Sequence, residues 1–463
     1  MTTTASASTP SITTDRLLAM AGGQLARDRW SRDRLLAYQA ERLRDLIAHA
    51  VAASPYYRDL LGPDAATGDV ALSELPTLPK ATLMDDFDRV VTDPRLRRAA
   101  LEAHLSGPDS GQPYLGRFRL FTTAGTTGER GLFVEDADEF AGWSATCLRG
   151  LASWGLRPAT RLADIGSPSP LHISNQAYAV LLAGRPAAAP RLTVTTPLAE
   201  MVTALNDFQP EALTAYPSVA AALAEEQLQG RLRIAPGVVA TSSEVQTADM
   251  RRRMREAWGV EPLDFYGTTE ALILAAGRPG QEGMDVLEDL VIVEVVDEHD
   301  RPVAPGVPGR KVLLTNLVGR VQPLLRYELT DSVTLAGGPN PLGLPYQRLV
   351  AVDGRSDDLI TLPGAGGGTV TVFPFRLLAP FAELLEVRQY QVVHDAAGFH
   401  VAVVLREGAP AGTPARVRAA LARELRDAGA IPPPIEVTPA PELHRDPGHG
   451  AKLKLVRSIP AQA

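Results

Sequence analysis

The sequence predicts an α/β fold, in which a large N-terminal part of layered sheets and helices is followed by a small α+β part. Residues 117–300 alternate short β-prone apolar runs with helical stretches, which is typical of helices packed on a largely parallel sheet. After residue 286 the pattern changes to strands separated by Gly/Pro turns, which favours antiparallel pairing. A chain of 463 residues is also long enough for two or three domains.

The N-terminal segment starts as a polar stretch and continues as helices. Residues 1–13 lack the apolar core of a signal peptide, and we expect a short disordered leader there. Residues 14–61 are predicted to be helical because apolar positions recur at three- and four-residue spacing, for example in RLLAYQAERLRDLIAHAVAA.

The middle and the end of the chain supply the strands. Within 117–300 the expected strands include RLADIG, RLTVTT, ALTAY, GVVATSS and PLDFY, with helices such as SVAAALAEEQLQG between them. Later, YQVVHD and FHVAVVLRE are strand-like and ARVRAALARELRDAG is helical, which predicts a small separate unit over roughly 355–463.

Composition excludes several classes of function. The net charge is −8 and the pI is near 5.6, so a basic face for nucleic acid is not expected. No apolar run approaches the ~20 residues that span a bilayer, which argues against a membrane protein. The single cysteine, Cys147, excludes an internal disulfide and a cysteine-based zinc site, and it fits the reducing cytoplasm.

Lysine is rare in this chain. It occurs only at Lys80, Lys311, Lys452 and Lys454, and the remaining basic residues are arginines. A GC-rich genome explains the bias, yet a surviving lysine is a candidate for a role that the broad guanidinium fork cannot fill. Two of the four lie together in AKLKLVR near the C-terminus.

Five short stretches carry residues suited to chemistry. They are FTTAGTTGERG (121–131), LDFYGTTEA (263–271), PLLRYELTDSV (323–333), VDGRSDDLITL (352–362) and GHGAKLKLVR (448–457). The first can turn backbone N–H groups around a polyphosphate, because its glycines permit φ > 0. Glu270 can bind a metal through oxygen, and Asp331 can accept hydrogen bonds from two sugar hydroxyls. Each stretch alone is equally compatible with an ordinary turn, a surface ion pair or a solvated tail.

Taken together, the order and spacing of the five stretches resemble the ANL superfamily of adenylate-forming enzymes. Within it the chain is most similar to the phenylacetate–CoA ligase branch, through LIAHAVAASPYYRDLL, AYPSVAAALAE and TSSEVQTADMRRRMREAWG. The resemblance covers about residues 35–460. It implies an ATP- and acid-binding domain over 14–354 and a small mobile C-terminal domain over 355–463 that carries a catalytic lysine.

The resemblance also implies roles for individual residues. The residues at the β- and γ-phosphates of ATP would be Thr122, Thr123, Gly125, Thr126, Thr127 and Gly128. Tyr266 would stack on adenine, next to Gly267 and Thr268, which would also bind ATP, and Ser243 and Glu244 would lie beside adenine and substrate. Asp331 and Arg355 would bind the ribose. Thr269 would bind the α-phosphate, Glu270 would bind Mg²⁺, and Asp357 would be the hinge.

Two features of the motifs leave questions open. The family often has serine where Ala124 stands, and proline and a basic residue where Arg130 and Gly131 stand, so we expect phosphate contacts that differ in detail from those of the family while the loop keeps its role. The catalytic lysine is either Lys454, which fits Lys-x-x-Arg, or Lys452, which follows a glycine by two positions; we prefer Lys454 and keep both.

The implied reaction is ATP-dependent activation of a small aromatic carboxylic acid as an acyl-adenylate, with pyrophosphate release and transfer to the thiol of CoA. ATP, Mg²⁺ and CoA are the expected cofactors, and Trp154, His172 and Tyr216 are candidates for the acid pocket. One alternative keeps adenylation but changes the acceptor to an amine, a carrier protein or nitrite chemistry. Another is a nucleotide-binding regulatory protein without turnover. The sequence leaves monomer or dimer open.

Overall fold

The computed structural model describes most of the chain. The described residues are 12–66, 70–123, 131–157, 159–167, 169, 171–182, 190–355, 360–372, 374–382, 384, 386–443 and 453–459. Within them, no helix is both long enough and apolar enough to cross a membrane.

Helices form residues 14–61, as the spacing of the apolar residues predicts, and three more helices follow by residue 106. They are α1 (Thr14–Ala26), α2 (Arg32–Ala53), α3 (Pro55–Leu61), α4 (Lys80–Asp85), α5 (Phe87–Val90) and α6 (Arg98–Ser106), with 3-10 turns at Arg27–Arg29, Pro63–Ala66 and Leu72–Glu74. Thr13, Ser31 and Ser54 begin the first three helices, since each side chain accepts a backbone N–H of the first turn.

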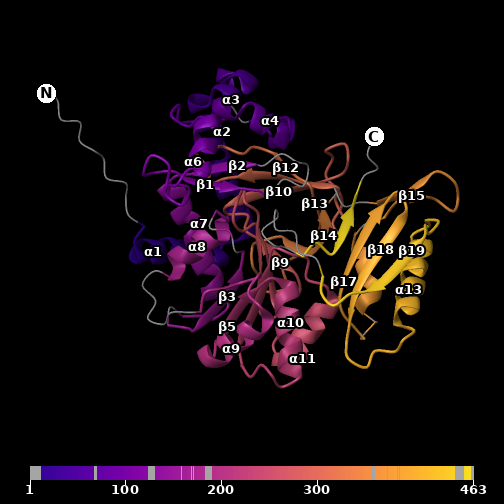
Figure 1. Cartoon of the computed structure of the whole chain (residues 1–463). Coiled ribbons are helices and arrows are strands. Elements are labelled where there is room, and N and C mark those ends of the chain that lie inside the picture. Colours follow the sequence, from indigo (N-terminus) through magenta and orange to yellow (C-terminus); the bar gives the residue numbers. More distant parts are fainter. Residues whose placement is uncertain are drawn as a thin grey trace.

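A nine-stranded mixed sheet forms the centre of the large part (Figure 1). Its order is β13-β14-β9-β8-β7-β6-β5-β3-β4, with bounds β3 (Leu162–Gly166), β4 (Leu192–Thr193), β5 (Ala212–Ala215), β6 (Val238–Ser242), β7 (Leu263–Tyr266), β8 (Ala275–Gly277), β9 (Met284–Val286), β13 (Asp331–Leu335) and β14 (Arg348–Arg355). Strands β4, β3, β5, β6 and β7 are parallel, as predicted. The direction reverses after β7, because β8 follows by a connection too short for a crossover.

Helices cover both faces of the parallel strands. On one face lie α7 (Ala137–Ser153) and α8 (Ile173–Leu182), and Leu162 and Ala212 pack there against Leu151 and Trp154. On the other lie α9 (Leu198–Phe208), α10 (Pro217–Leu228) and α11 (Ala248–Trp258), packed on strand residues such as Leu213. Because side chains alternate along a strand, each residue of the sheet belongs to one face or the other.

Two smaller sheets complete the large part. The hairpin β1 (Arg119–Thr122) and β2 (Leu132–Glu135) encloses residues 123–131, and β10 (Val291–Val296), β11 (Lys311–Asn316) and β12 (Tyr327–Leu329) form an antiparallel sheet. The antiparallel pairing expected after residue 286 is therefore present.

The C-terminal part is a sheet with order β19-β18-β17-β20, covered by a helix (Figure 1). Its elements are β15 (Ile360–Pro363), β16 (Thr369–Val372), α12 (Pro374–Leu378), a 3-10 turn at Ala379–Ala382, β17 (Val387–Asp395), β18 (Gly398–Leu405), α13 (Thr413–Asp427), β19 (Ile435–Pro439) and β20 (Val456–Ser458). The two strands and the helix predicted there correspond to β17, β18 and α13.

Polar contacts hold this sheet against α10 and α11. The buried guanidinium of Arg253 donates to the carbonyls of Val387 and Arg388, at 2.7 and 2.6 Å. Arg406 forms an ion pair with Glu225 of α10 at 2.5 Å. These contacts dock the start of β17 and the residue after β18 against two helices that cover one face of the parallel strands.

Candidate active site

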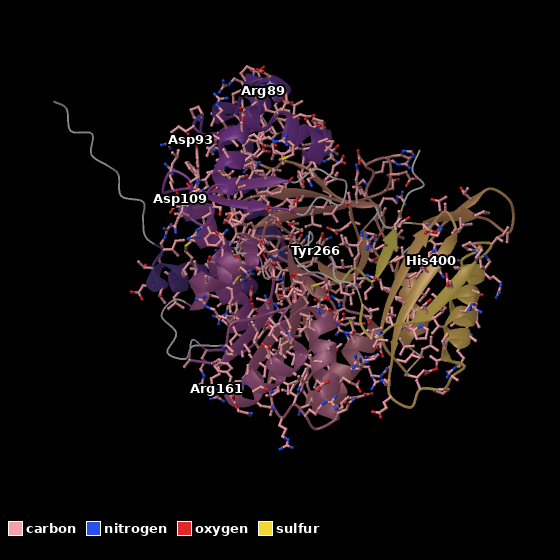
Figure 2. The ribbon with its side chains drawn as sticks, viewed as in Figure 1. Arg89, Asp93, Asp109, Arg161, Tyr266 and His400 are labelled. Carbon is pink, nitrogen blue, oxygen red and sulfur yellow. The ribbon has the colours of Figure 1, made fainter. Side chains whose placement is uncertain are left out.

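Two of the sequence motifs meet at the end of β7. The hydroxyl of Tyr266 donates a hydrogen bond to the Asp331 carboxylate, with 2.8 Å between Oη and Oδ2, although 65 residues separate them. Asp331 begins β13, and in the antiparallel pairing with β14 it lies opposite Arg355. Figure 2 shows Tyr266 near the middle of the molecule, between the N-terminal helices and the sheet that carries His400.

The loop after Tyr266 is tightly built. A Cβ at Gly267 would lie 2.3 Å from the Leu272 carbonyl oxygen, so the turn requires glycine. The Leu274 N–H donates to the Tyr266 carbonyl, and the Asn316 side chain donates to the Glu270 carbonyl at 2.9 Å. These contacts fix the backbone on both sides of the two threonines.

The polar side chains of this loop differ in their burial and in their hydrogen bonding. The hydroxyl of Thr268 is buried and has no hydrogen-bond partner within the described residues. Glu270 is buried and Thr269 is half-buried. A buried hydroxyl without a partner is uncommon in a folded protein and is consistent with a ligand that supplies the missing hydrogen bond.

Only the base of the Thr/Gly loop is described. Thr122 ends β1, and Thr123 pairs with Gly131 across the loop: the Thr123 N–H donates to the Gly131 carbonyl, and the Gly131 N–H donates to the Thr123 hydroxyl at 2.9 Å. Gly125, Thr126, Thr127 and Gly128 lie outside the described residues. The loop is thus closed at its base by two hydrogen bonds.

A lysine that the motif analysis did not assign lies beside this loop. The ammonium of Lys80 donates to the Thr123 hydroxyl at 3.3 Å. The chain is brought there by Leu78, whose backbone exchanges two hydrogen bonds with Arg326 and Glu328. The scarcity of lysine was the only sequence signal that could have pointed to Lys80, because its position depends on pairing with residues about 250 positions away.

The end of β6 connects the site to the C-terminal segment. Ser243 has φ of 72°, a left-handed conformation unusual for serine. Next to it, the Glu244 carboxylate accepts the Ser218 N–H in the first turn of α10 at 3.1 Å and the Leu453 N–H at 2.6 Å. Negative charge is favoured at a helix N-terminus, so Glu244 stabilises α10 and binds the C-terminal segment at once.

Lys454 follows directly after this contact. Its carbonyl accepts the Gln391 side chain at 2.9 Å, and the Leu455 carbonyl accepts the Val392 N–H at 2.7 Å. The backbone of Lys454 is therefore fixed between Glu244 and β17, and its side chain is half-buried. Lys452 and Asp357 lie outside the described residues, as do all atoms of the Arg355 side chain.

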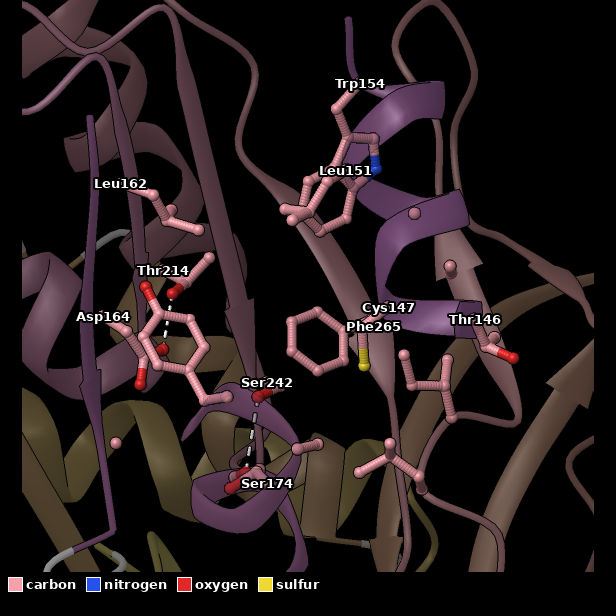
Figure 3. A pocket seen from close by; sticks show the side chains of 18 of the residues that line it. Thr146, Cys147, Leu151, Trp154, Leu162, Asp164, Ser174, Thr214, Ser242 and Phe265 are labelled. Carbon is pink, nitrogen blue, oxygen red and sulfur yellow. Dashed lines mark hydrogen bonds between the residues drawn. The ribbon is translucent and has the colours of Figure 1, made fainter. Parts of the chain in front are cut away.

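A cavity of about 110 Å³ lies between the sheet and α7, next to these groups (Figure 3). A water-sized group needs roughly 10–15 Å³ of such space, so the cavity admits a small organic molecule. Its wall contains Trp154 and Tyr216 but not His172, which instead bonds Ser174, a cavity residue, at 2.7 Å. Figure 3 shows Phe265 at the centre, with Leu162 on one side and Cys147 on the other.

Burial controls the ionisation of the groups around the cavity. It raises the pKa of the Cys147 thiol to about 12, so this cysteine is protonated at neutral pH. It also raises the pKa of Tyr216, and the nearby carboxylates of Glu244 and Asp164 add to this effect. Within the described residues, no cluster of three or more His, Cys, Asp or Glu side chains could hold a metal ion by itself.

Comparisons with known proteins identify the relatives of this chain. No protein-family model matches it. A phenylacetate-coenzyme A ligase of Thermus thermophilus is 26% identical over 380 residues, which cover 78% of each chain. A second phenylacetate-coenzyme A ligase, from Pseudomonas putida, is 25% identical over 383 residues, which cover 78% of this chain and 79% of the relative. The resemblance predicted from the motifs is confirmed.

Solved structures show the same fold at lower identity. The chain resembles 2-hydroxyisobutyryl-CoA ligase in the postadenylation state in complex with R3-HIB-AMP, with a TM-score of 0.73 and 19% identity over 94% of this chain and 91% of that one. Against the same ligase in the thioesterification state, with 2-HIB-AMP and CoA, the TM-score is 0.58, with 20% identity and the same coverage of 94% and 91%. The arrangement of the two parts here is thus closer to the postadenylation state.

Proposed function

We propose that this chain, a homologue of phenylacetate–CoA ligases, activates a small aromatic carboxylic acid with ATP and transfers the acyl group to CoA. The observation that carries the proposal is the hydrogen bond between Tyr266 and Asp331, which joins the two motifs that we assign to adenine and to the ribose. The contact of Leu453 with Glu244 adds the C-terminal lysine segment to the same end of the sheet.

The nucleotide would bind across the ends of the strands. We assign Tyr266 to adenine, Asp331 and Arg355 to the ribose hydroxyls, and the backbone and hydroxyls of Thr122–Gly128 to the β- and γ-phosphates, with Ser243 at the border between adenine and acid. The Glu244 carboxylate already accepts two backbone N–H groups, so we assign it to holding the lysine segment.

The first half-reaction joins two anions, and charge repulsion is a large part of its barrier. An oxygen of the acid carboxylate attacks the α-phosphorus, the bond to the β-phosphate oxygen breaks, and pyrophosphate leaves with the bonding electron pair. Lys80 lies at the base of the phosphate loop and can neutralise the tail, while Thr269 and Lys454 or Lys452 can stabilise charge at the α-phosphate and the leaving oxygen.

One carboxylate in the loop fits the needs of Mg²⁺. Glu270 is an acidic side chain of the loop, two positions after Thr268, whose hydroxyl has no hydrogen-bond partner among the described residues. Mg²⁺ usually binds one or two carboxylates together with substrate phosphates and water. When bound there, the ion would neutralise phosphate charge in the first half-reaction.

In the second half-reaction, the sulfur of CoA attacks the acyl carbonyl carbon. The bond from that carbon to the adenylate oxygen breaks, AMP leaves, and the thiol proton passes to solvent. We infer that the C-terminal part turns about Asp357 between the two steps. The higher TM-score against the postadenylation state supports this reading, since the present arrangement then belongs to the first step.

The side chains that line the cavity favour an aromatic acid over a long aliphatic acid as the substrate. Trp154 and Phe265 form an aromatic pair with 6.3 Å between ring centroids, and the Trp154 indole is held by the Gly277 carbonyl at 2.8 Å. Both line the cavity together with Leu162. Fixed aromatic walls of this kind favour a flat ring through stacking and edge contacts.

Pyrophosphate release tests the proposal. Wild-type protein would be incubated with ATP, Mg²⁺ and a panel of aryl and alkyl acids, with and without CoA, and the products separated. We expect acid-dependent pyrophosphate and AMP, and an acyl-CoA when CoA is present. Pyrophosphate only with nitrite, or acyl transfer only to an amine or carrier protein, would contradict CoA as acceptor. ATP binding without release would contradict turnover altogether.

A further inference from the structure

The acid cavity contains a carboxylate of its own. Asp164 lies in the middle of β3, on the face that lines the cavity, and Thr214 lies opposite it on β5. The Thr214 hydroxyl donates to Asp164 Oδ1 at 2.5 Å (Figure 3, dashed line). Both are surrounded by apolar groups such as Leu162 and Phe265.

Within the described residues this carboxylate has only the Thr214 hydroxyl as a partner. An ionised carboxylate can accept about four hydrogen bonds, and Asp164 Oδ2 accepts none from these residues. The basic side chains that line the cavity are already paired, Arg149 with Asp289 at 2.9 Å and Arg278 with Asp285 at 2.7 Å. Neither a cation nor a second donor is therefore bonded to Asp164 among the described residues, although the unpartnered Tyr216 hydroxyl lines the same cavity.

Asp164 is half-buried, and other carboxylates of this sheet are better satisfied. Asp264 is on the opposite face of the same sheet and accepts from the Thr241 hydroxyl and from the Phe265 N–H. Asp285 accepts from three side chains, those of Arg278, Gln281 and Asn340. Burial with few donors disfavours the charged form, and the pKa of Asp164 is raised to about 6, so it is still mostly ionised at neutral pH.

Next to the second oxygen the chain has a glycine, with the Asn175 amide oxygen 3.5 Å from the position that a Cβ would take. A Cβ at Gly166 would lie 3.2 Å from Asp164 Oδ2, and Gly166 itself lines the cavity. Asp164 is two residues before the carboxyl end of β3, roughly 7 Å along the strand from the end where the nucleotide motifs lie. That separation is comparable with the distance across a ring from its carboxylate to a substituent.

We propose that the acid activated by this protein carries an amino or hydroxyl group, which donates a hydrogen bond to Asp164 at the inner part of the cavity. The proposal rests on the adenylation function above and specifies its substrate class. A donor group would supply the partner that Asp164 lacks, whereas an unsubstituted ring would leave the carboxylate buried and poorly hydrogen-bonded. Acids without a hydrogen-bond donor should therefore bind poorly in the cavity, because they leave the Asp164 carboxylate without a second hydrogen bond.

The test compares acids that differ only in the donor. Unsubstituted, hydroxyl-, amino- and methoxy-substituted benzoic and arylacetic acids, with the group at each ring position, would be measured for binding by protein fluorescence and for pyrophosphate release. A methoxy group is polar but cannot donate a hydrogen bond, so these analogues serve as the control. We expect at least one amino or hydroxy acid to exceed its unsubstituted and methoxy analogues about 10- to 100-fold in both affinity and kcat/KM, as for a hydrogen bond to a charged group.

Two variants test whether the preference for acids with a donor group depends on Asp164. Asp164→Asn should lose this preference, while Asp264→Asn, a matched change on the opposite face of the sheet, should keep it. Equal binding of donor and methoxy acids by the wild type would overturn the proposal even if Asp164→Asn failed to fold, and so would an unchanged preference in that variant. Donor-dependent binding without pyrophosphate release would support this inference and contradict the adenylation function instead, so the two failures are distinguishable.

Discussion

At the scale of single residues, the three lysines that the structure describes have different surroundings. Lys311 forms ion pairs with Asp300 and Glu328 at 2.7 and 2.8 Å, on the antiparallel sheet. Lys80 instead approaches a threonine hydroxyl at the base of the Thr/Gly loop, and Lys454 lies next to a backbone contact with Glu244. Lys311 is thus accounted for by its ion pairs, and it provides a control for the other two.

Lys80→Ala should weaken the use of ATP. Removing a cation from the phosphate tail is expected to raise the KM for ATP and to lower kcat for pyrophosphate release, together by about 10²-fold in kcat/KM. Steady-state pyrophosphate release at varied ATP measures both constants. Lys311→Ala, which removes a lysine from a structural ion pair, should leave them nearly unchanged, and equal losses in the two variants would argue against a phosphate role for Lys80.

Lys454→Ala should abolish adenylation while ATP still binds. The loss expected for a group that stabilises charge in the transition state is roughly 10²- to 10³-fold in kcat. Thioester formation from supplied acyl-adenylate and CoA should be retained, because the proposed mechanism uses the lysine only in the first half-reaction. A normal rate in Lys454→Ala together with a loss in Lys452→Ala would move the catalytic role two positions toward the N-terminus.

The ionisation of Asp164 makes stability depend on pH in a defined direction. Folding raises the pKa of this carboxyl from 3.8 to about 6, so the folded state holds the proton more tightly than the unfolded state. The protonated carboxyl therefore adds to the free energy of unfolding at low pH, and this contribution is lost as the pH rises through about 6. Asp164→Asn removes this effect. The variant should exceed the wild type in free energy of unfolding by up to about 3 kcal/mol at pH 7.5, and the difference should narrow toward pH 4.5. Urea unfolding across this range measures it, and a pH-independent difference would contradict the assignment.

Some of these residues could be read from the sequence and others could not. Tyr266, Glu270 and Asp331 belong to local motifs whose order is informative, and the structure brings Tyr266 and Asp331 into contact. Lys80 and Asp164 have no such local signal. Their surroundings depend on long-range pairing, of Leu78 with Tyr327 in one case and of β3 with β5 in the other.

At the scale of elements, the segment 453–458 is held between two parts of the molecule. The Leu453 N–H bonds to Glu244, and β20 then pairs in parallel with β17. Alternation of strands and helices predicted the parallel strands of the large part, but nothing local to AKLKLVR predicted its contact with the first turn of α10. The reversal of strand direction after β7 was also not predicted from the sequence. The short connection that causes it contains residues that were interpreted only as a nucleotide-binding motif.

Glu244→Gln should slow the first half-reaction selectively. The amide can accept only one of the two backbone N–H groups well, so the lysine segment is held less firmly, and we expect about a 10-fold lower rate of acid-dependent pyrophosphate release. Thioester formation from supplied acyl-adenylate should be unaffected. Glu225→Gln weakens a different polar contact between the same two parts, with Arg406, and serves as the control. Equal losses in both half-reactions would mean that Glu244 only stabilises α10.

At the scale of the whole molecule, Tyr266 and Glu244 lie at or just after the carboxyl ends of β7 and β6, where they bond Asp331 and the C-terminal segment, and the cavity extends from this end along the face of the sheet that α7 covers. The fold class and the order of its parts were predictable, because hydrophobic periodicity and turn residues are local properties. The docking of the C-terminal sheet was not, since it depends on side chains such as Arg253, which bonds carbonyls more than 130 residues away. The TM-score is higher against the postadenylation structure of 2-hydroxyisobutyryl-CoA ligase than against its thioesterification structure, 0.73 against 0.58.

The central claim, that the acid is activated by attack of its own carboxylate on the α-phosphate, can be tested by following one oxygen atom. The acid would be supplied with ¹⁸O in its carboxylate, together with ATP, Mg²⁺ and CoA, and the products analysed by mass spectrometry. Because thioester formation leaves the bridging oxygen on phosphorus, we predict one ¹⁸O in AMP and none in pyrophosphate. Formation of ADP, or unlabelled AMP alongside acyl-CoA, would contradict an acyl-adenylate intermediate.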